Sequence, residues 1–278
     1  MPGLFLGPGN ALRPGWRALL FYLATAGAYR LVLGLAPAVP PSVGLCATLL
    51  AVSALFLALE DRSLPSLGLR PGAAWARDFA LGAAGGCGII LLSALLAYAA
   101  GGFHLVRGAG AGALAPGAAF YFLPAFSEEL AFRGYLFQRV EWGLGTLGAL
   151  LLLSVLFSIA HFSNPGMAGP TAVFAAVNIF LAGVVLGLAY LGTRSLALPF
   201  GLHLGWNWCQ GSLLGFGVSG TEAVGCFAPV PHARAAWLTG GAFGLEGGLA
   251  CTLVCLLACY ILRRHCPVRD PKSPFSKQ

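Results

Sequence analysis

The 278-residue chain is 58% hydrophobic and only 9% charged. Soluble domains carry about 25% charged residues, so a soluble protein of this composition could not cover its surface with polar groups. The formal net charge is +7, but the basic residues are scattered one or two per loop, as the positive-inside rule predicts for a membrane protein. The composition therefore indicates an integral membrane protein and argues against nucleic acid as a partner.

Apolar stretches dominate the chain from end to end. A spanning helix needs about 20 mostly apolar residues, and Gly or Pro residues separate the stretches that approach this length. In chain order they cover residues 18–36, 41–59, 79–101, 115–138, 146–162, 170–191, 195–217 and 241–262. The sequence thus predicts an all-α fold, a polytopic bundle of about eight transmembrane helices forming a single membrane domain, 1–278.

The distribution of Arg and Lys predicts the orientation of this bundle. With a cytoplasmic N-terminus, thirteen basic residues fall on the inner side, whereas the outer loops hold only Arg107 and Arg234. We therefore expect both termini to be cytoplasmic. The eight cysteines include Cys251, Cys255 and Cys259 on one helix face in continuous apolar sequence, where cysteine behaves as a small hydrophobic residue.

Ionisable side chains inside the apolar stretches are candidates for function, because each is costly in hydrocarbon. They are Arg30, Glu128, Glu129, Arg133, His161, His203 and Glu246, with Asn207 as an uncharged companion. They concentrate in the fourth, fifth and seventh stretches. The sequence shows no GxSxG motif, and Cys209 has no neighbouring base in sequence.

The segment 127–133 contains two adjacent glutamates. Glu129 and Arg133 are four residues apart, so they share one helix face and can form an ion pair. Glu128 points elsewhere and has no local cation, which suits a general base or acid. The alternative is a structural charge cluster that stabilises a helix crossing.

His161 lies at the end of the fifth stretch. A turn near Gly145 would leave Glu129 16 residues before it and His161 16 residues after it, at similar depth in an antiparallel hairpin. Glu128 or Glu129 can then approach His161. Taken alone, His161 is better explained as a helix-end or interface histidine.

The third polar element is His203 and Asn207, four residues apart on one face of the seventh stretch. An amide beside an imidazole can donate hydrogen bonds to an oxyanion, although an interhelical polar clamp has the same pattern. The three elements together predict a water-filled site within the membrane. Such a site would hydrolyse a peptide bond without a covalent enzyme intermediate. By residue count His203 is shallower than the other groups, and a broken or tilted helix would reconcile the depths.

Three motifs occur in order: EELAFR fits EExxxR, FSIAH fits FxxxH, and HLGWN fits HxxxN. They resemble the CPBP family of CAAX proteases and bacteriocin-processing enzymes. The matched core covers residues 115–210, which are spans four to seven of the predicted bundle.

The resemblance implies an intramembrane endopeptidase of the bacterial cell membrane. Its partners would be membrane lipid and a membrane-associated protein or peptide, lipidated in CAAX-type members, with bacteriocin processing as a bacterial role. Carried over by position, Glu128 and His161 activate water, and His203 and Asn207 form the oxyanion hole. Glu129 and Arg133 become supporting residues.

The resemblance leaves the cofactor open between two alternatives. A glutamate-type protease would need none, whereas a metalloprotease could hold zinc on Glu128, His161 and His203. Other functions compatible with a buried polar cluster are a non-catalytic scaffold or chaperone, a small-solute transporter, and a lipid-modifying hydrolase. These alternatives predict different effects of substituting the motif residues on activity.

Overall fold

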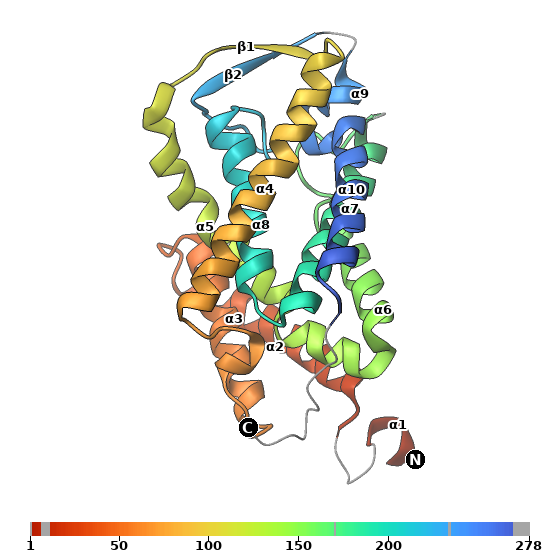
Figure 1. Cartoon of the computed structure of the whole chain (residues 1–278). Helices are drawn as coiled ribbons and strands as arrows, with labels where there is room; N and C mark the ends of the chain where they lie inside the picture. Colours follow the sequence, from red (N-terminus) through yellow and green to blue (C-terminus); the bar gives the residue numbers. More distant parts are fainter. Residues whose placement is uncertain (1, 7–11, 170, 233–234, 269–278) are drawn as a thin grey trace.

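The computed structural model describes residues 2–6, 12–169, 171–232 and 235–268. Helices dominate this part of the chain, so the predicted all-α bundle is confirmed (Figure 1). The helices are α1 Pro2–Phe5, α2 Pro14–Leu35, α3 Pro41–Ala58, α4 Ala73–Ala99, α5 Leu114–Arg133, α6 Tyr135–Ala160, α7 Thr171–Thr193, α8 Ala197–Trp208, α9 Ala236–Thr239 and α10 Leu249–His265. Two short strands, β1 Phe103–Arg107 and β2 Phe227–Pro231, pair antiparallel at one end of the bundle, and the sequence analysis did not foresee them.

The outer surface of the bundle is apolar. Large hydrophobic side chains such as Leu95, Leu147 and Val173 are exposed, at 60%, 67% and 67%. Five helical segments of the described structure are long and apolar enough to cross a membrane: Pro14–Leu35, Pro41–Ala58, Ala73–Ala99, Gly110–Ala160 and Thr171–Thr193. Apolar surface outside and charged groups inside is the arrangement that lipid favours, so the protein is an integral membrane protein.

The last predicted span differs from the structure. Residues 241–248 do not continue a helix into α10, because Gly240, Gly241 and Gly244 adopt positive φ angles of 77°, 58° and 102°. Two short 3-10 turns, Gly241–Phe243 and Leu245–Gly247, form there instead. The prediction of a continuous span over 241–262 is therefore wrong, and Glu246 lies in a turn rather than in a helix.

The hairpin between the fourth and fifth predicted spans also differs. The chain breaks at Gly134, which ends α5 at a point where a Cβ would collide with the Leu130 carbonyl oxygen. It bends again at Gly145, whose φ of 74° interrupts α6. The expected single turn near Gly145 is thus replaced by two glycine breaks, and the part of α6 between them crosses the lower end of the bundle in Figure 1.

Helix α8 is held against α4 by glycines on both helices. A Cβ on Gly86 of α4 would collide with the Leu202 carbonyl oxygen, and one on Gly205 of α8 would collide with the Ala83 carbonyl oxygen. Gly82 and Gly201 make the same kind of close approach. Small residues spaced by four let two membrane helices pack backbone to backbone. This contact fixes the position of α8, which carries His203 and Asn207.

Buried ion pairs gather at one end of the bundle. The Glu60 carboxylate lies 2.7 Å from Arg17 and 2.8 Å from Arg139, and it accepts a 2.6 Å hydrogen bond from the Tyr135 hydroxyl. From the sequence, Arg17 and Arg139 were counted only among the basic residues of the inner side, and no role was predicted for Glu60 or Tyr135.

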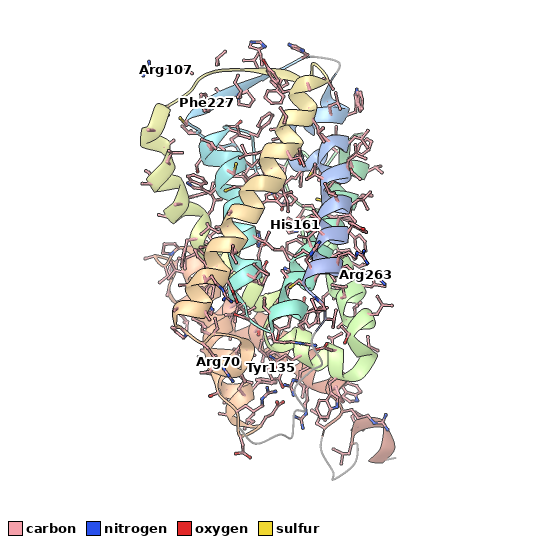
Figure 2. All side chains as sticks on the ribbon, in the orientation of Figure 1. Arg70, Arg107, Tyr135, His161, Phe227 and Arg263 are labelled. Atoms are coloured by element: carbon pink, nitrogen blue, oxygen red, sulfur yellow. The ribbon has the colours of Figure 1, made fainter. Side chains whose placement is uncertain are left out.

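The two ends of the bundle differ in the residues that they carry. Figure 2 shows Tyr135 and Arg70 toward one end, Arg107 and Phe227 at the other, and His161 between them. The cytoplasmic location of the termini stays a prediction. Four of the basic residues counted for it lie outside the described residues: Arg234, Arg269, Lys272 and Lys277.

Candidate active site

The two adjacent glutamates occupy the last turns of α5, just before the break at Gly134. Glu129 is fully buried, with 0% of its side chain exposed, whereas 33% of the Glu128 side chain is exposed. Adjacent residues of a helix point about 100° apart, so the two carboxylates face different surroundings. Each glutamate can therefore do different chemistry.

The predicted pair of Glu129 and Arg133 is present. Arg133 Nη1 donates to Glu129 Oε1 at 3.0 Å, and Nη2 donates to the Gly183 carbonyl of α7 at 3.1 Å. The guanidinium also lies 4.7 Å from the ring centroid of Phe157 on α6. Arg133 thus ties α5 to α6 and α7, and its supporting role in the site stays a prediction.

Glu129 has a second partner that spacing could not predict. His203 Nδ1 on α8 lies 2.8 Å from the same Glu129 oxygen that Arg133 binds. A carboxylate only accepts hydrogen bonds, so Nδ1 must carry the proton of this contact. His203 Nε2 can therefore donate only when the imidazole carries a second proton. Glu129 fixes both the orientation and the tautomer of His203.

His161 ends α6, and its ring is oriented by its own helix. Nδ1 lies 2.7 Å from the Phe157 carbonyl oxygen, which is an acceptor only, so Nδ1 donates this bond. In the neutral imidazole the lone pair is then on Nε2. That atom faces Glu128, with Nε2 and Oε2 separated by 3.9 Å. His161 is therefore set to accept a proton on the side of Glu128.

Glu128 faces both histidines. Its Oε2 atom lies 3.7 Å from His203 Nε2, in addition to 3.9 Å from His161 Nε2. Oε2 is buried, and no group in the described part of the chain hydrogen-bonds to it. Direct hydrogen bonds are shorter, at about 2.7–3.2 Å, so neither of these two contacts is a direct hydrogen bond. The structure thus brings the predicted Glu128, His161 and His203 together from three helices.

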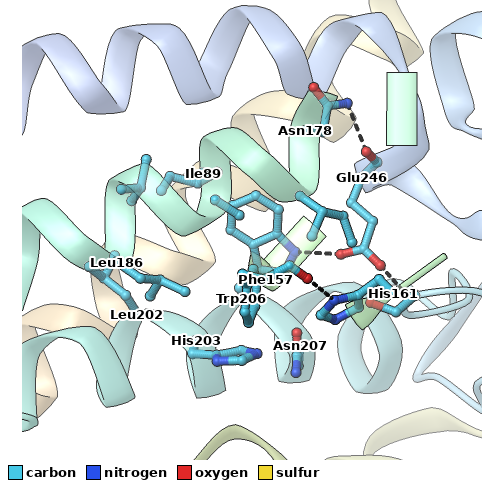
Figure 3. A pocket seen from close by; sticks show the side chains of 14 residues that line it. Ile89, Phe157, His161, Asn178, Leu186, Leu202, His203, Trp206, Asn207 and Glu246 are labelled. Atoms are coloured by element: carbon cyan, nitrogen blue, oxygen red, sulfur yellow. Dashed lines mark hydrogen bonds between the residues drawn. The ribbon is translucent and has the colours of Figure 1, made fainter. Parts of the chain in front are cut away.

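A cavity opens beside the two imidazoles (Figure 3). Its polar lining consists of His161, His203, Asn207, Asn178, Ser219 and Glu246, and the remainder of the wall is mostly aliphatic. The space open to water is about 30 Å³, and a water molecule needs about 10–15 Å³ of this measure. Asn207 lies beside His203 on the cavity wall, as the four-residue spacing predicted.

Two other candidates have different outcomes. Arg30 is an exposed residue of α2 and is not among the residues that line the cavity, so the structure does not bring it to this site. Glu246 comes from outside the three motifs and nevertheless lines the cavity. No helical spacing connects Glu246 to the motif residues, because the chain returns to the site through the glycine-rich turn 240–248.

Zinc would need a more compact arrangement of ligands. Zn–N and Zn–O bonds of about 2.0–2.2 Å hold neighbouring ligand atoms about 3.4 Å apart in a tetrahedron, less than the separations found around Glu128 Oε2. Within the described residues, no group of three or more His, Cys, Asp or Glu side chains is arranged to hold a metal ion. The choice between a glutamate-type and a metal-dependent site stays a prediction.

A lipid-facing helical bundle with a buried cluster of carboxylates and imidazoles defines an all-α integral membrane protein with a polar site among its helices. Residues 110–209 match the family model described as Rce1-like, type II CAAX prenyl endopeptidase. This match covers 100 of the 278 residues and is consistent with a CPBP-family intramembrane protease. No curated protein matches the chain, and no solved structure does either.

Proposed function

We propose that the protein is an intramembrane endopeptidase of glutamate type, which hydrolyses a peptide bond of a membrane-associated, lipidated protein. The observation that carries the proposal is the unpartnered Glu128 Oε2 facing Nε2 of two histidines at 3.7 and 3.9 Å. One water can bridge Glu128 to either imidazole at an ordinary hydrogen-bond distance of about 2.8 Å. Glu128 is then the general base for this water.

The proposed reaction transfers one proton and breaks one bond. Glu128, helped by the lone pair of His161 Nε2, takes a proton from water as the water oxygen attacks the substrate carbonyl carbon. The C–N bond of the tetrahedral intermediate then breaks. The leaving nitrogen receives the proton that Glu128 took from the water, which gives a carboxylic acid and an amine. The carboxylic acid then loses its own proton to solvent and leaves as a carboxylate.

The oxyanion of this intermediate needs fixed donors. His203 supplies one from Nε2 when doubly protonated, with its Nδ1 proton held by Glu129. The Asn207 amide supplies the other from the same face of α8. With protonated His203 and Arg133, and with Glu128 and Glu129 ionised, the buried group is electrically neutral, which limits its desolvation penalty.

The substrate class follows from the family match. The matched model is that of a CAAX prenyl endopeptidase, which supports a prenylated or otherwise lipidated peptide that reaches the site from the membrane. The distribution of Arg and Lys supports cytoplasmic termini, and the sequence resemblance suggests a location in the bacterial cell membrane. Bacteriocin processing is a second substrate class that the sequence resemblance suggests.

The proposal predicts that activity is independent of metal. Enzyme dialysed extensively against a chelator should cleave a farnesylated peptide ending in Cys-aliphatic-aliphatic-X at the rate of untreated enzyme. Metal content by mass spectrometry checks the removal. If activity is lost when stoichiometric zinc is removed and returns when zinc is added back, the protein is a metalloprotease rather than a glutamate-type protease.

Asn207 provides the test that separates a protease from a transporter. Removal of one oxyanion donor lowers turnover about 100- to 1000-fold in characterised enzymes. Asn207→Ala should therefore lower kcat for the farnesylated peptide by about this factor and leave KM nearly unchanged, because the interaction exists only in the transition state.

Asn207→Asp is the matched variant. It keeps the shape of the side chain but replaces a donor with a charged acceptor, so it should be at least as damaging as alanine. A transporter that uses Asn207 to bind a cation would show the reverse order. An aspartate variant with wild-type activity would contradict the role assigned to this residue.

A further inference from the structure

Glu246 is a buried carboxylate that the mechanism above does not use. It lies in the 3-10 turn Leu245–Gly247 that precedes α10, and only 5% of the residue is exposed. Among the ion pairs of the described residues, none includes Glu246. A carboxylate in such a place must be held by neutral donors, since an unsolvated charge without partners is costly.

Those donors come from two different parts of the fold. Trp206 Nε1 on α8 donates to Glu246 Oε2 at 3.1 Å, and the backbone N–H of Ser219 donates to Oε1. The turn itself is clamped to α7, because Asn178 Nδ2 donates to the carbonyl oxygens of Glu246 and Gly248 at 2.7 and 2.9 Å. Each carboxylate oxygen thus has its own donor. The side chain therefore bridges α8 and the loop 214–226, which contains Ser219 and is called the 219 loop below.

The bridge ends next to the proposed oxyanion donors. Trp206 directly precedes Asn207 and follows His203 by three residues, so all three lie within one turn of α8. Figure 3 shows the Glu246 carboxylate on the wall of the cavity that also contains His161, His203 and Asn207. Glycines fix the opposite side of α8 against α4, whereas the Glu246 to Trp206 bond is a polar contact that fixes the cavity side.

The helix needs such a contact because it is short and irregular. Regular α8 has 12 residues, and it passes into the π-helical turn Cys209–Leu213 directly after Trp208. A π-turn inside a helix is frequently found at a functional site. A fixed hydrogen bond from Trp206 sets the rotation of the last regular turn, where Asn207 lies.

We propose that Glu246 is a positioning residue of the hydrolytic site: it fixes Trp206 and the 219 loop, and thereby holds His203 and Asn207 in place for the oxyanion. This inference rests on the proposed protease function. It assigns Glu246 no contact with the reacting atoms. The role depends on the two separate hydrogen bonds that its oxygens accept.

A mutant cycle tests this arrangement. Glu246→Gln keeps the volume but replaces one oxygen with an NH2 group, which must face either the Trp206 N–H or the Ser219 N–H. Trp206→Phe removes the indole donor. In the double variant the glutamine oxygen can accept from Ser219 while its NH2 group meets no opposing donor. The double variant should therefore cleave substrate with a higher kcat than Glu246→Gln alone.

The readout is the steady-state cleavage of the farnesylated Cys-aliphatic-aliphatic-X peptide, per folded molecule and well below the melting temperature. Glu246→Gln should lower kcat about 10- to 100-fold with little change in KM, as expected of misplaced catalytic groups. The double variant should recover part of this loss but stay below the wild-type kcat, because it still lacks the hydrogen bond from Trp206. Glu222→Gln, which changes an exposed carboxylate, is the matched control and should behave as wild type.

A second readout does not depend on turnover. Carbethoxylation of His203, located by mass spectrometry, should be several-fold faster in Glu246→Gln than in wild type and slower again in the double variant. If wild type shows no cleavage that depends on Glu128, the protease proposal fails and the labelling still tests the positioning of α8. Unchanged kcat and unchanged labelling in Glu246→Gln would overturn the inference, as would a loss confined to thermal stability.

Discussion

Glu128→Gln should abolish cleavage of the farnesylated peptide, with kcat reduced about 100- to 10,000-fold, the range attributed to general base catalysis. The substitution removes the titratable oxygen that faces His161 and His203 and leaves the volume almost unchanged. Among the described residues, Oε2 of Glu128 has no hydrogen bond to lose. The variant should therefore purify and melt like the wild-type protein.

The matched control is Glu222→Gln, a carboxylate exposed outside the cavity, which should retain full activity. The comparison separates the loss of a particular base from a general effect of removing a negative charge. Wild-type kcat in Glu128→Gln would rule out Glu128 as the base. A low kcat that is explained by a large drop in melting temperature would make Glu128 a structural residue.

Glu129→Ala should instead damage both folding and activity. Glu129 is fully buried and accepts hydrogen bonds from Arg133 at 3.0 Å and from His203 at 2.8 Å. Its removal leaves the Arg133 guanidinium, only 2% exposed, without its carboxylate. Breaking a buried ion pair costs about 3–5 kcal/mol, so the melting temperature in detergent should fall markedly.

A double variant separates the two effects. Glu129→Ala with Arg133→Met removes both charges, so most of the lost stability should return. Activity should not return, because His203 still lacks the acceptor that fixes its Nδ1 proton. A Glu129→Ala variant with wild-type stability, or a double variant with wild-type kcat, would contradict the roles given to this pair.

The sequence predicted the helices of this fold well where they are long and apolar. The stretches that became α2, α3, α4 and α7 stand out because a helix must run about 20 apolar residues to cross a bilayer. The breaks were harder to predict. Gly134 and Gly244 interrupt sequence that was expected to be helix, and only their close contacts and, at Gly244, a positive φ reveal the interruptions, whereas the break at Gly145 falls at the turn expected there.

The sequence predicted those contacts of the site that join residues four apart on one helix. The pairing of Glu129 with Arg133, and the proximity of His203 and Asn207, follow from four-residue separations. The contact of Glu129 with His203 joins residues 74 apart in sequence, and no local pattern encodes it. The same limit applies to Glu246, which reaches the cavity through a turn that was expected to be helix.

The different depths that residue counting gave for Glu129, His161 and His203 have a structural explanation. The count from a single turn at Gly145 put Glu129 and His161 deeper than His203. In the structure α5 ends at Arg133, so Glu129 lies four residues from a helix end, and the first part of α6 crosses the bundle before His161 is reached (Figure 1). A broken helix brings the three groups to one level, which had been one of the two ways to reconcile the depths.

The most direct test of the central claim compares the protein termini of cells that produce wild-type enzyme with those of cells that produce Glu128→Gln, by mass spectrometry of N- and C-terminal peptides. The account predicts new C-termini on a small set of membrane-associated proteins, present with wild type and absent with the variant. Equal amounts of both proteins in the membrane fraction serve as the control. Identical termini in the two samples would contradict the claim that Glu128 activates water for peptide-bond hydrolysis.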